Sequence, residues 1–99
     1  MKIVHKLIES FEEELEGAKE YAEKYIDSKA RGNIVRAEKY SEMAKDELKH
    51  AGYMKEFAIR DYEEIKKVYP IPTDIDEAFE HALKKSSECM ATVKQMLSM

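Results

Sequence analysis

The chain has 99 residues, of which 38% are charged and 43% hydrophobic, and its formal net charge at pH 7 is −4. This length predicts one small domain, and the acidic balance without a basic face argues against a nucleic-acid binder. No apolar run is long enough to cross a membrane, and the N-terminal MKIVHKLIES lacks the apolar core of a signal peptide. The single cysteine, Cys89, excludes a disulfide framework and is expected to be a small buried hydrophobe in the reducing cytoplasm.

The first predicted helix covers residues 2–30. Its apolar positions recur every three or four residues, which is typical of an amphipathic helix. They are Ile3, Leu7, Phe11, Leu15, Ala18, Tyr21, Ala22, Tyr25 and Ile26. The segment KARGN then breaks the pattern. We expect Gly32 to end this helix in the left-handed conformation and Asn33 to cap the next one.

A second helix is predicted over residues 34–68 and a third over residues 73–97. The apolar stripe of the second contains Ala37, Tyr40, Met43, Ala44, Leu48, Ala51, Met54, Phe57, Ala58 and Ile65. The segment YPIPTD ends this helix, because two prolines in three residues cannot continue it. Thr73 and Asp76 resemble a capping box at the start of the third helix.

The two long helices predict self-association. Helices of roughly 28 and 35 residues are about 40–50 Å long, and two of them cannot enclose a core on their own. The third helix can cover part of their apolar surface, and a second copy of the chain can cover the rest. The predicted fold is therefore all-α: an antiparallel hairpin with a third, C-terminal helix, which dimerises into a four-helix bundle.

Charged side chains interrupt the apolar stripes midway along both long helices. Glu47 and His50 lie among apolar or small residues on the second helix, and we expect both to point inward. Glu14 interrupts the stripe of the first helix in the same way. It lies 18 residues before Gly32, and Glu47 lies 15 residues after it, so the two carboxylates are expected at the same level of the hairpin. A buried carboxylate needs a partner.

Two carboxylates and an imidazole are ligands that Fe²⁺, Mn²⁺ and Zn²⁺ accept. One hairpin supplies too few of them for two ions. A two-fold axis would double the set to four carboxylates and two imidazoles, and the four negative charges would balance two divalent cations. The pattern predicts a di-metal carboxylate centre between two chains.

Two segments resemble the metal-binding helices of the ferritin-like superfamily. EEELEGAKEY, with Glu14, Gly17 and Tyr21, resembles the first of these helices, and EMAKDELKHAGYM, with Glu47 and His50, resembles the second. A chain with a single hairpin resembles the half-length encapsulated ferritins.

This resemblance implies a function and a set of partners. Glu14, Glu47 and His50 would bind iron, two ions per dimer, and Tyr21 would be a hydrogen-bonding residue beside them. The site would oxidise Fe²⁺ as a ferroxidase, for iron storage or detoxification. The resemblance also implies a homodimer, a larger ring, and an encapsulin shell, so that the protein would lie in the cytoplasm or inside a protein nanocompartment.

Other interpretations of these residues stay open. In a chain with 16 glutamates, Glu47 and His50 can be an accidental pair. Tyr21 can be a core aromatic with a polar tip, and Glu77 with His81 can be a second metal pair or two exposed side chains. The alternative function is a non-catalytic helical protein-interaction module without metal. The segment ARGNIVRAEKYSEMA, which resembles part of a tetratricopeptide hairpin, favours it, although only one copy is present.

Overall fold

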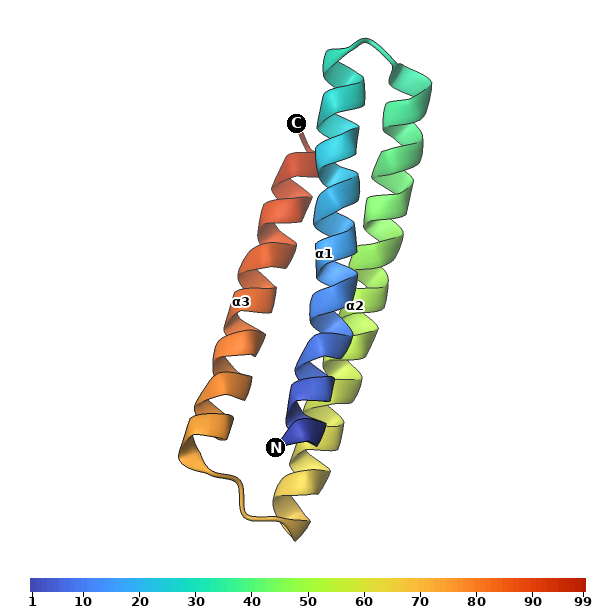
Figure 1. Ribbon diagram of the computed structural model, residues 1–99. Helices are drawn as coiled ribbons and strands as arrows, with labels where there is room; N and C mark the ends of the chain where they lie inside the picture. Colours follow the sequence, from blue (N-terminus) through green and yellow to red (C-terminus); the bar gives the residue numbers. More distant parts are fainter.

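The protein is a rod of three helices, and the computed structural model describes all 99 residues. α1 spans Lys2–Ala30, α2 spans Ile34–Val68 and α3 spans Thr73–Leu97. The rod measures 54 × 18 × 18 Å, and all three helices run along its length (Figure 1). The all-α prediction is confirmed, and dimerisation stays a prediction. No helix contains a segment apolar and long enough to span a membrane.

The turn between α1 and α2 forms as the sequence predicts. Gly32 has φ +78°, and its N–H donates to the carbonyl of Lys29 at 3.0 Å. The N–H of Asn33 donates to the carbonyl of Ser28 at 2.9 Å, which completes a Schellman motif. The Asn33 side chain accepts a hydrogen bond from the backbone N–H of Arg36 at 3.2 Å and caps α2. This tight turn makes the hairpin antiparallel and sets its register.

Small side chains let the two helices of the hairpin lie close together. α2 buries an alanine at every seventh position, over three seven-residue repeats: Ala37, Ala44, Ala51 and Ala58. α1 contributes Ala18 and Ala22, both fully buried. A seven-residue repeat keeps one face of a helix against its neighbour. The side chains beside this alanine stripe are therefore brought within contact distance across the hairpin.

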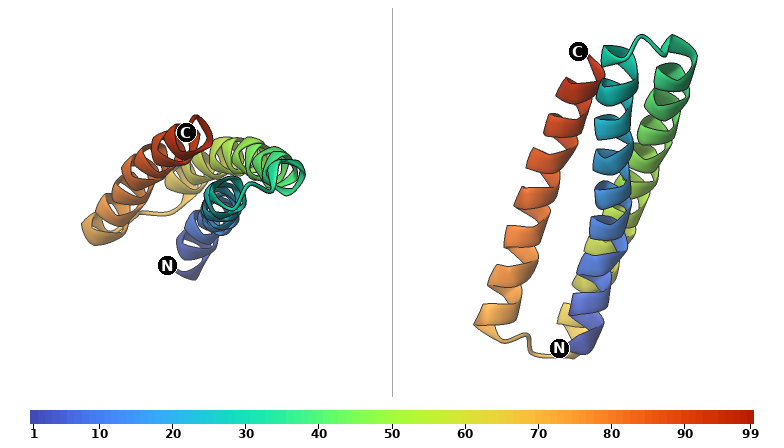
Figure 2. Two further views of the ribbon diagram at one scale, coloured as in Figure 1. Left: turned by 90° about the horizontal axis from the view of Figure 1, so that it is seen from above. Right: turned by 45° about the horizontal axis from the view of Figure 1, so that its top comes forward.

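α3 returns along α1 and touches α2 much less (Figures 1 and 2). The core lies where the three helices meet. Its buried members are Val4, Phe11, Leu15, Ala18, Ala22, Ala44, Leu48, Ala51, Ala58, Tyr62, Phe79, Ala82 and Val93. One side of the α1–α2 hairpin is thus covered by α3, and the other side has no helix of this chain against it.

The predicted capping box at the start of α3 is wrong. The N-cap is Pro72, whose side chain has no oxygen to offer, and Thr73 is already the first helical residue. The Asp76 carboxylate instead accepts a hydrogen bond from the Tyr62 hydroxyl at 2.5 Å. A buried phenol needs an acceptor more than an exposed backbone N–H does, because water can satisfy the exposed group. Asp76 therefore joins α3 to α2 rather than capping its own helix.

Candidate metal centre

Glu14, Glu47 and His50 come together midway along the hairpin. The Nδ1 atom of His50 lies 3.8 Å from Oε2 of Glu14 and 4.0 Å from Oε1 of Glu47. One ligand atom from each residue lies within 4.8 Å of the other two, and no other three histidine, cysteine or carboxylate side chains converge in this way. Ligands at about 2.0–2.2 Å from one ion are at most about 4.4 Å apart. Both His50 distances meet that condition, so His50 could share one transition-metal ion with either carboxylate.

The three side chains are less buried than the sequence predicts. They are exposed to 31% for Glu14, 28% for Glu47 and 54% for His50. In the single chain Glu14 and Glu47 are half-buried and His50 is exposed, so their burial in a bundle of two chains stays a prediction. Ala44 and Ala51 are the residues of α2 that are buried here against α1, and the three candidate ligands lie at the edge of this helix–helix contact.

The ligands lie on the side of the hairpin away from α3. The residues of α1 that line a hollow beside α3 are Glu12, Leu15, Glu16 and Lys19. At about 100° per residue, Glu14 is turned by roughly 150° from the middle of this set. The face that carries the ligands is therefore the one that α3 leaves uncovered.

Exposed apolar side chains surround the ligands on α2. Met43, Tyr53 and Phe57 are all exposed, although Met43 and Phe57 were expected in the core. With Glu47 and His50 they follow the three-and-four spacing of one helix face, within an arc of about 120°. We call this surface the ligand face: Glu14 of α1 with Met43, Glu47, His50, Tyr53 and Phe57 of α2. Sequence periodicity alone could not separate it from the adjoining alanine stripe, because the two stripes are one residue apart.

The two carboxylates perturb each other. The pKa of Glu47 is raised above its usual value, chiefly by a hydrogen bond with Glu14, then by burial and by repulsion from the Glu14 charge. The imidazole of His50 acts in the opposite direction when it carries a proton. Carboxylates that approach this closely oppose each other's ionisation, so the neighbouring Glu14 favours the uncharged form of Glu47. A divalent cation would relieve the same repulsion.

Tyr21 lies on α1 two turns beyond Glu14. Its ring stacks on that of Tyr40, with centroids 6.3 Å apart, and the ammonium of Lys24 lies 5.9 Å from the centre of the Tyr21 ring. It packs against the core and makes no hydrogen bond to Glu14, Glu47 or His50. The core-aromatic interpretation therefore describes its contacts in the single chain, and a hydrogen-bonding role beside the metal stays a prediction.

The other candidate residues do not assemble into a site. Glu77 and His81 are exposed on α3 and belong to no cluster of metal-ligating side chains. His81 lines an open hollow with Glu88 and two lysines, Lys84 and Lys85, whose charges would repel a cation. Cys89 is half-buried and packs against the core, as a small hydrophobe does.

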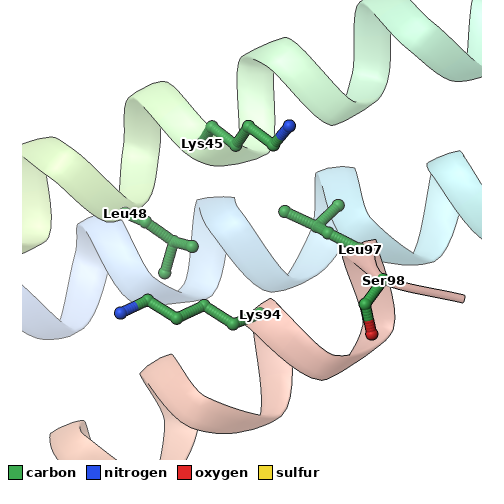
Figure 3. Close-up of a pocket in the computed structure, with 5 residues that line it drawn as sticks. All are labelled: Lys45, Leu48, Lys94, Leu97 and Ser98. Atoms are coloured by element: carbon green, nitrogen blue, oxygen red, sulfur yellow. The ribbon is translucent and has the colours of Figure 1, made fainter.

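Another hollow, which lies between α2 and α3, is also unsuited to a metal. It has a volume of about 390 Å³ and lies near the C-terminal end of α3 (Figure 3). Its lining consists of Lys45, Leu48, Lys94, Leu97 and Ser98. With two ammonium groups and no carboxylate or imidazole, it offers a cation nothing to bind.

Comparison of the chain with models of known protein families, with curated proteins and with solved structures gave no match. The function of the site must therefore be argued from its side chains and their geometry. The ferritin-like resemblance stays a prediction.

Proposed function

We propose that this chain is a half-length, ferritin-like iron protein that oxidises Fe²⁺. Two copies pair through the ligand face and hold two iron ions between them. The observation that carries the proposal is the convergence of Glu14, Glu47 and His50 on a face that α3 leaves uncovered. The bound iron would supply the redox chemistry, with O₂ or peroxide as the electron acceptor.

The number of ligands favours a site shared by two chains. One chain offers two carboxylates and one imidazole, which leaves a single ion with open positions and cannot hold two. Across a two-fold axis, both copies of each ligand would meet at the interface, because an isologous contact pairs a surface with itself. Four carboxylates would then offset the charge of two divalent ions.

The apolar part of the ligand face supports the same pairing. Met43, Tyr53 and Phe57 are exposed in the single chain, and pairing would remove them from water. Aromatic residues and methionine are enriched in protein interfaces. They would also exclude water around the ligands, which strengthens the attraction between the carboxylates and a cation.

Each ligand has a defined task in this proposal. Glu14 and Glu47 would bind the cations as carboxylates, through their oxygens. His50 presents Nδ1 to both carboxylates in the single chain, and a neutral imidazole favours transition metals over Mg²⁺ and Ca²⁺. A larger ring and an encapsulin shell are further proposals that follow only from the resemblance.

The first test removes one ligand at a time. Glu47→Ala and His50→Ala should each abolish rapid Fe²⁺ oxidation and lower the iron content of protein loaded without oxygen, while circular dichroism shows unchanged helicity. His81→Ala is the matched control, because His81 is an exposed histidine outside the site. Oxidation at the wild-type rate in both ligand variants would contradict the assignment.

The second test asks whether the site is shared. Wild-type chains are mixed with tagged Glu47→Ala chains, and dimers with one of each are isolated. A shared site predicts that these dimers lose well over half of the oxidation rate, because no intact pair of ions remains. Independent sites predict half of the rate and half of the iron.

The alternative function is a helical interaction module without metal. The exposed Met43, Tyr53 and Phe57 also suit a surface that binds another protein. Metal analysis separates the two proposals, because only the first predicts one iron per chain. A dimer that forms without metal and neither binds nor oxidises added Fe²⁺ would favour the interaction module.

A further inference from the structure

Gly17 lies one turn after Glu14, where α1 faces α2. A Cβ atom built at this position would lie 3.0 Å from Oε2 of Glu47, 3.6 Å from its Cδ and 3.8 Å from its Cγ. The two carbon–carbon distances are ordinary van der Waals contacts, and the carbon–oxygen distance of 3.0 Å is tighter than most Cβ contacts. The end of the Glu47 side chain therefore lies directly over the Gly17 backbone.

The backbone does not require a glycine at this position. Gly17 has ordinary helical geometry, and the only residue with positive φ is Gly32. A glycine inside a helix is less stable than an alanine, because it loses more backbone freedom on folding. The other glycine inside a helix, Gly52, has nothing within 4 Å of where a Cβ would lie. Only at Gly17 is the missing side chain replaced by a neighbouring one.

We propose that Gly17 is a positioning residue for the metal site: by lacking a side chain, it lets Glu47 lie across α1 and bring its carboxylate beside Glu14. This inference rests on the proposed function. With a methyl group at position 17, the Glu47 carboxylate must move away by a few tenths of an ångström. Because the far end of a glutamate is flexible, the fold tolerates this movement, but the distances among the three ligands change.

The proposal predicts a selective loss of metal affinity. Changing a residue that orients a metal ligand typically lowers the affinity for the metal by about 10–100-fold. Gly17→Ala should therefore weaken metal binding by about that factor while the helices stay intact. Gly52→Ala, the matched control in α2, adds the same methyl group in open space and should change the affinity by less than about twofold.

Mn²⁺ is the probe, because it suits carboxylate and imidazole ligands. The affinity of the wild type and both variants is measured from the electron paramagnetic resonance signal of the free ion, and circular dichroism checks the helices. Equal affinities for wild type and Gly17→Ala, or equal losses in both variants, would overturn the proposal.

A measurement on metal-free wild-type protein tests the placement independently. Because Cγ of Glu47 lies close to Gly17, a nuclear Overhauser effect is expected between the Hγ atoms of Glu47 and the Hα atoms of Gly17. Its absence would overturn the proposal, even if Gly17→Ala failed to fold. Its presence in a wild-type protein that binds no Mn²⁺ or Fe²⁺ would instead contradict the proposed function and leave the placement of Glu47 intact.

Discussion

Two polar clusters in this molecule satisfy their side chains in opposite ways. At the junction of α2 and α3, the buried Tyr62 donates to Asp76 at 2.5 Å and stacks on Phe79 with centroids 4.0 Å apart. The ammonium of Lys66 lies 3.9 Å from the same carboxylate. Midway along the hairpin, Glu14 and Glu47 instead repel each other, and only His50 offsets them.

The difference separates a structural cluster from a candidate functional one. At the junction, the Tyr62 hydroxyl donates to the Asp76 carboxylate and the Lys66 ammonium lies beside it, so these groups need no added ligand. In the hairpin cluster, like charges lie side by side, and the free energy of the pair falls when a proton or a cation arrives. Strained polar groups of this kind are common at functional sites and rare in cores. Substitutions should therefore have opposite effects on stability in the two clusters.

The largest effect is expected from Phe79→Ala in the junction. The Phe79 ring is buried against Tyr62, and removing it leaves a cavity, so the free energy of unfolding should fall by about 3–5 kcal/mol. Urea unfolding at fixed protein concentration measures this loss. Tyr69→Ala is the control, because Tyr69 is exposed just beyond α2, and it should change the free energy by less than about 0.5 kcal/mol. Similar small losses in both variants would show that the junction does not stabilise the fold.

The sequence predicts the helices better than it predicts their contacts. The breaks at Gly32 and at the prolines follow from local backbone chemistry, and the structure shows both. Equal spacing from the turn placed Glu14 and Glu47 at one level, because the rise per residue is the same in both helices. Whether this level of the hairpin is buried or exposed depends on which side of the hairpin α3 covers, and no local rule decides that.

The junction cluster shows the same limit. Tyr62 and Asp76 are separated by the α2–α3 loop, so their hydrogen bond depends on how α3 folds back. The sequence favoured a local role for Asp76, as the partner of Thr73 in a cap. A tertiary contact replaced it because the buried hydroxyl of Tyr62 had no other acceptor.

A smaller effect is expected from Tyr62→Phe, which keeps the ring and removes the hydroxyl. The lost hydrogen bond to Asp76 should lower the free energy of unfolding by about 1 kcal/mol, since the half-exposed carboxylate can bind water instead. Burial and Asp76 raise the pKa of Tyr62, so the wild type loses stability as the pH rises above the usual tyrosine value of about 10. The difference between the two proteins, measured by urea unfolding, should shrink above that pH. A difference independent of pH would contradict the role of the hydroxyl.

The smallest effect on stability, and the only one of opposite sign, is expected from Glu47→Gln in the metal-free protein. Because the pKa of Glu47 is raised in the folded state, its contribution favours folding below the unfolded value of about 4.3 and is lost as the pH rises through the folded value. At pH 7 the ionised side chain therefore lowers stability, and an amide of the same shape should raise the urea midpoint in the presence of a chelator. Glu42→Gln, in which the replaced carboxylate is exposed and outside the cluster, is the control and should have little effect.

The same variant distinguishes the effect of protonating Glu47 on stability from the effect of binding a metal ion. At about pH 3, well below both pKa values, the Glu47 side chain is largely neutral in both states, so the gain from Glu47→Gln should largely disappear there. Added Mn²⁺ should raise the urea midpoint of the wild type at pH 7 by mass action and leave that of Glu47→Gln almost unchanged. The order of the two stabilities would then reverse, because the cation relieves in the wild type the repulsion that the amide removes in the variant. If the wild type is the more stable protein at pH 7 even with a chelator, repulsion between the Glu14 and Glu47 carboxylates does not lower stability. The polar groups midway along the hairpin would then stabilise the fold, as those at the junction of α2 and α3 do.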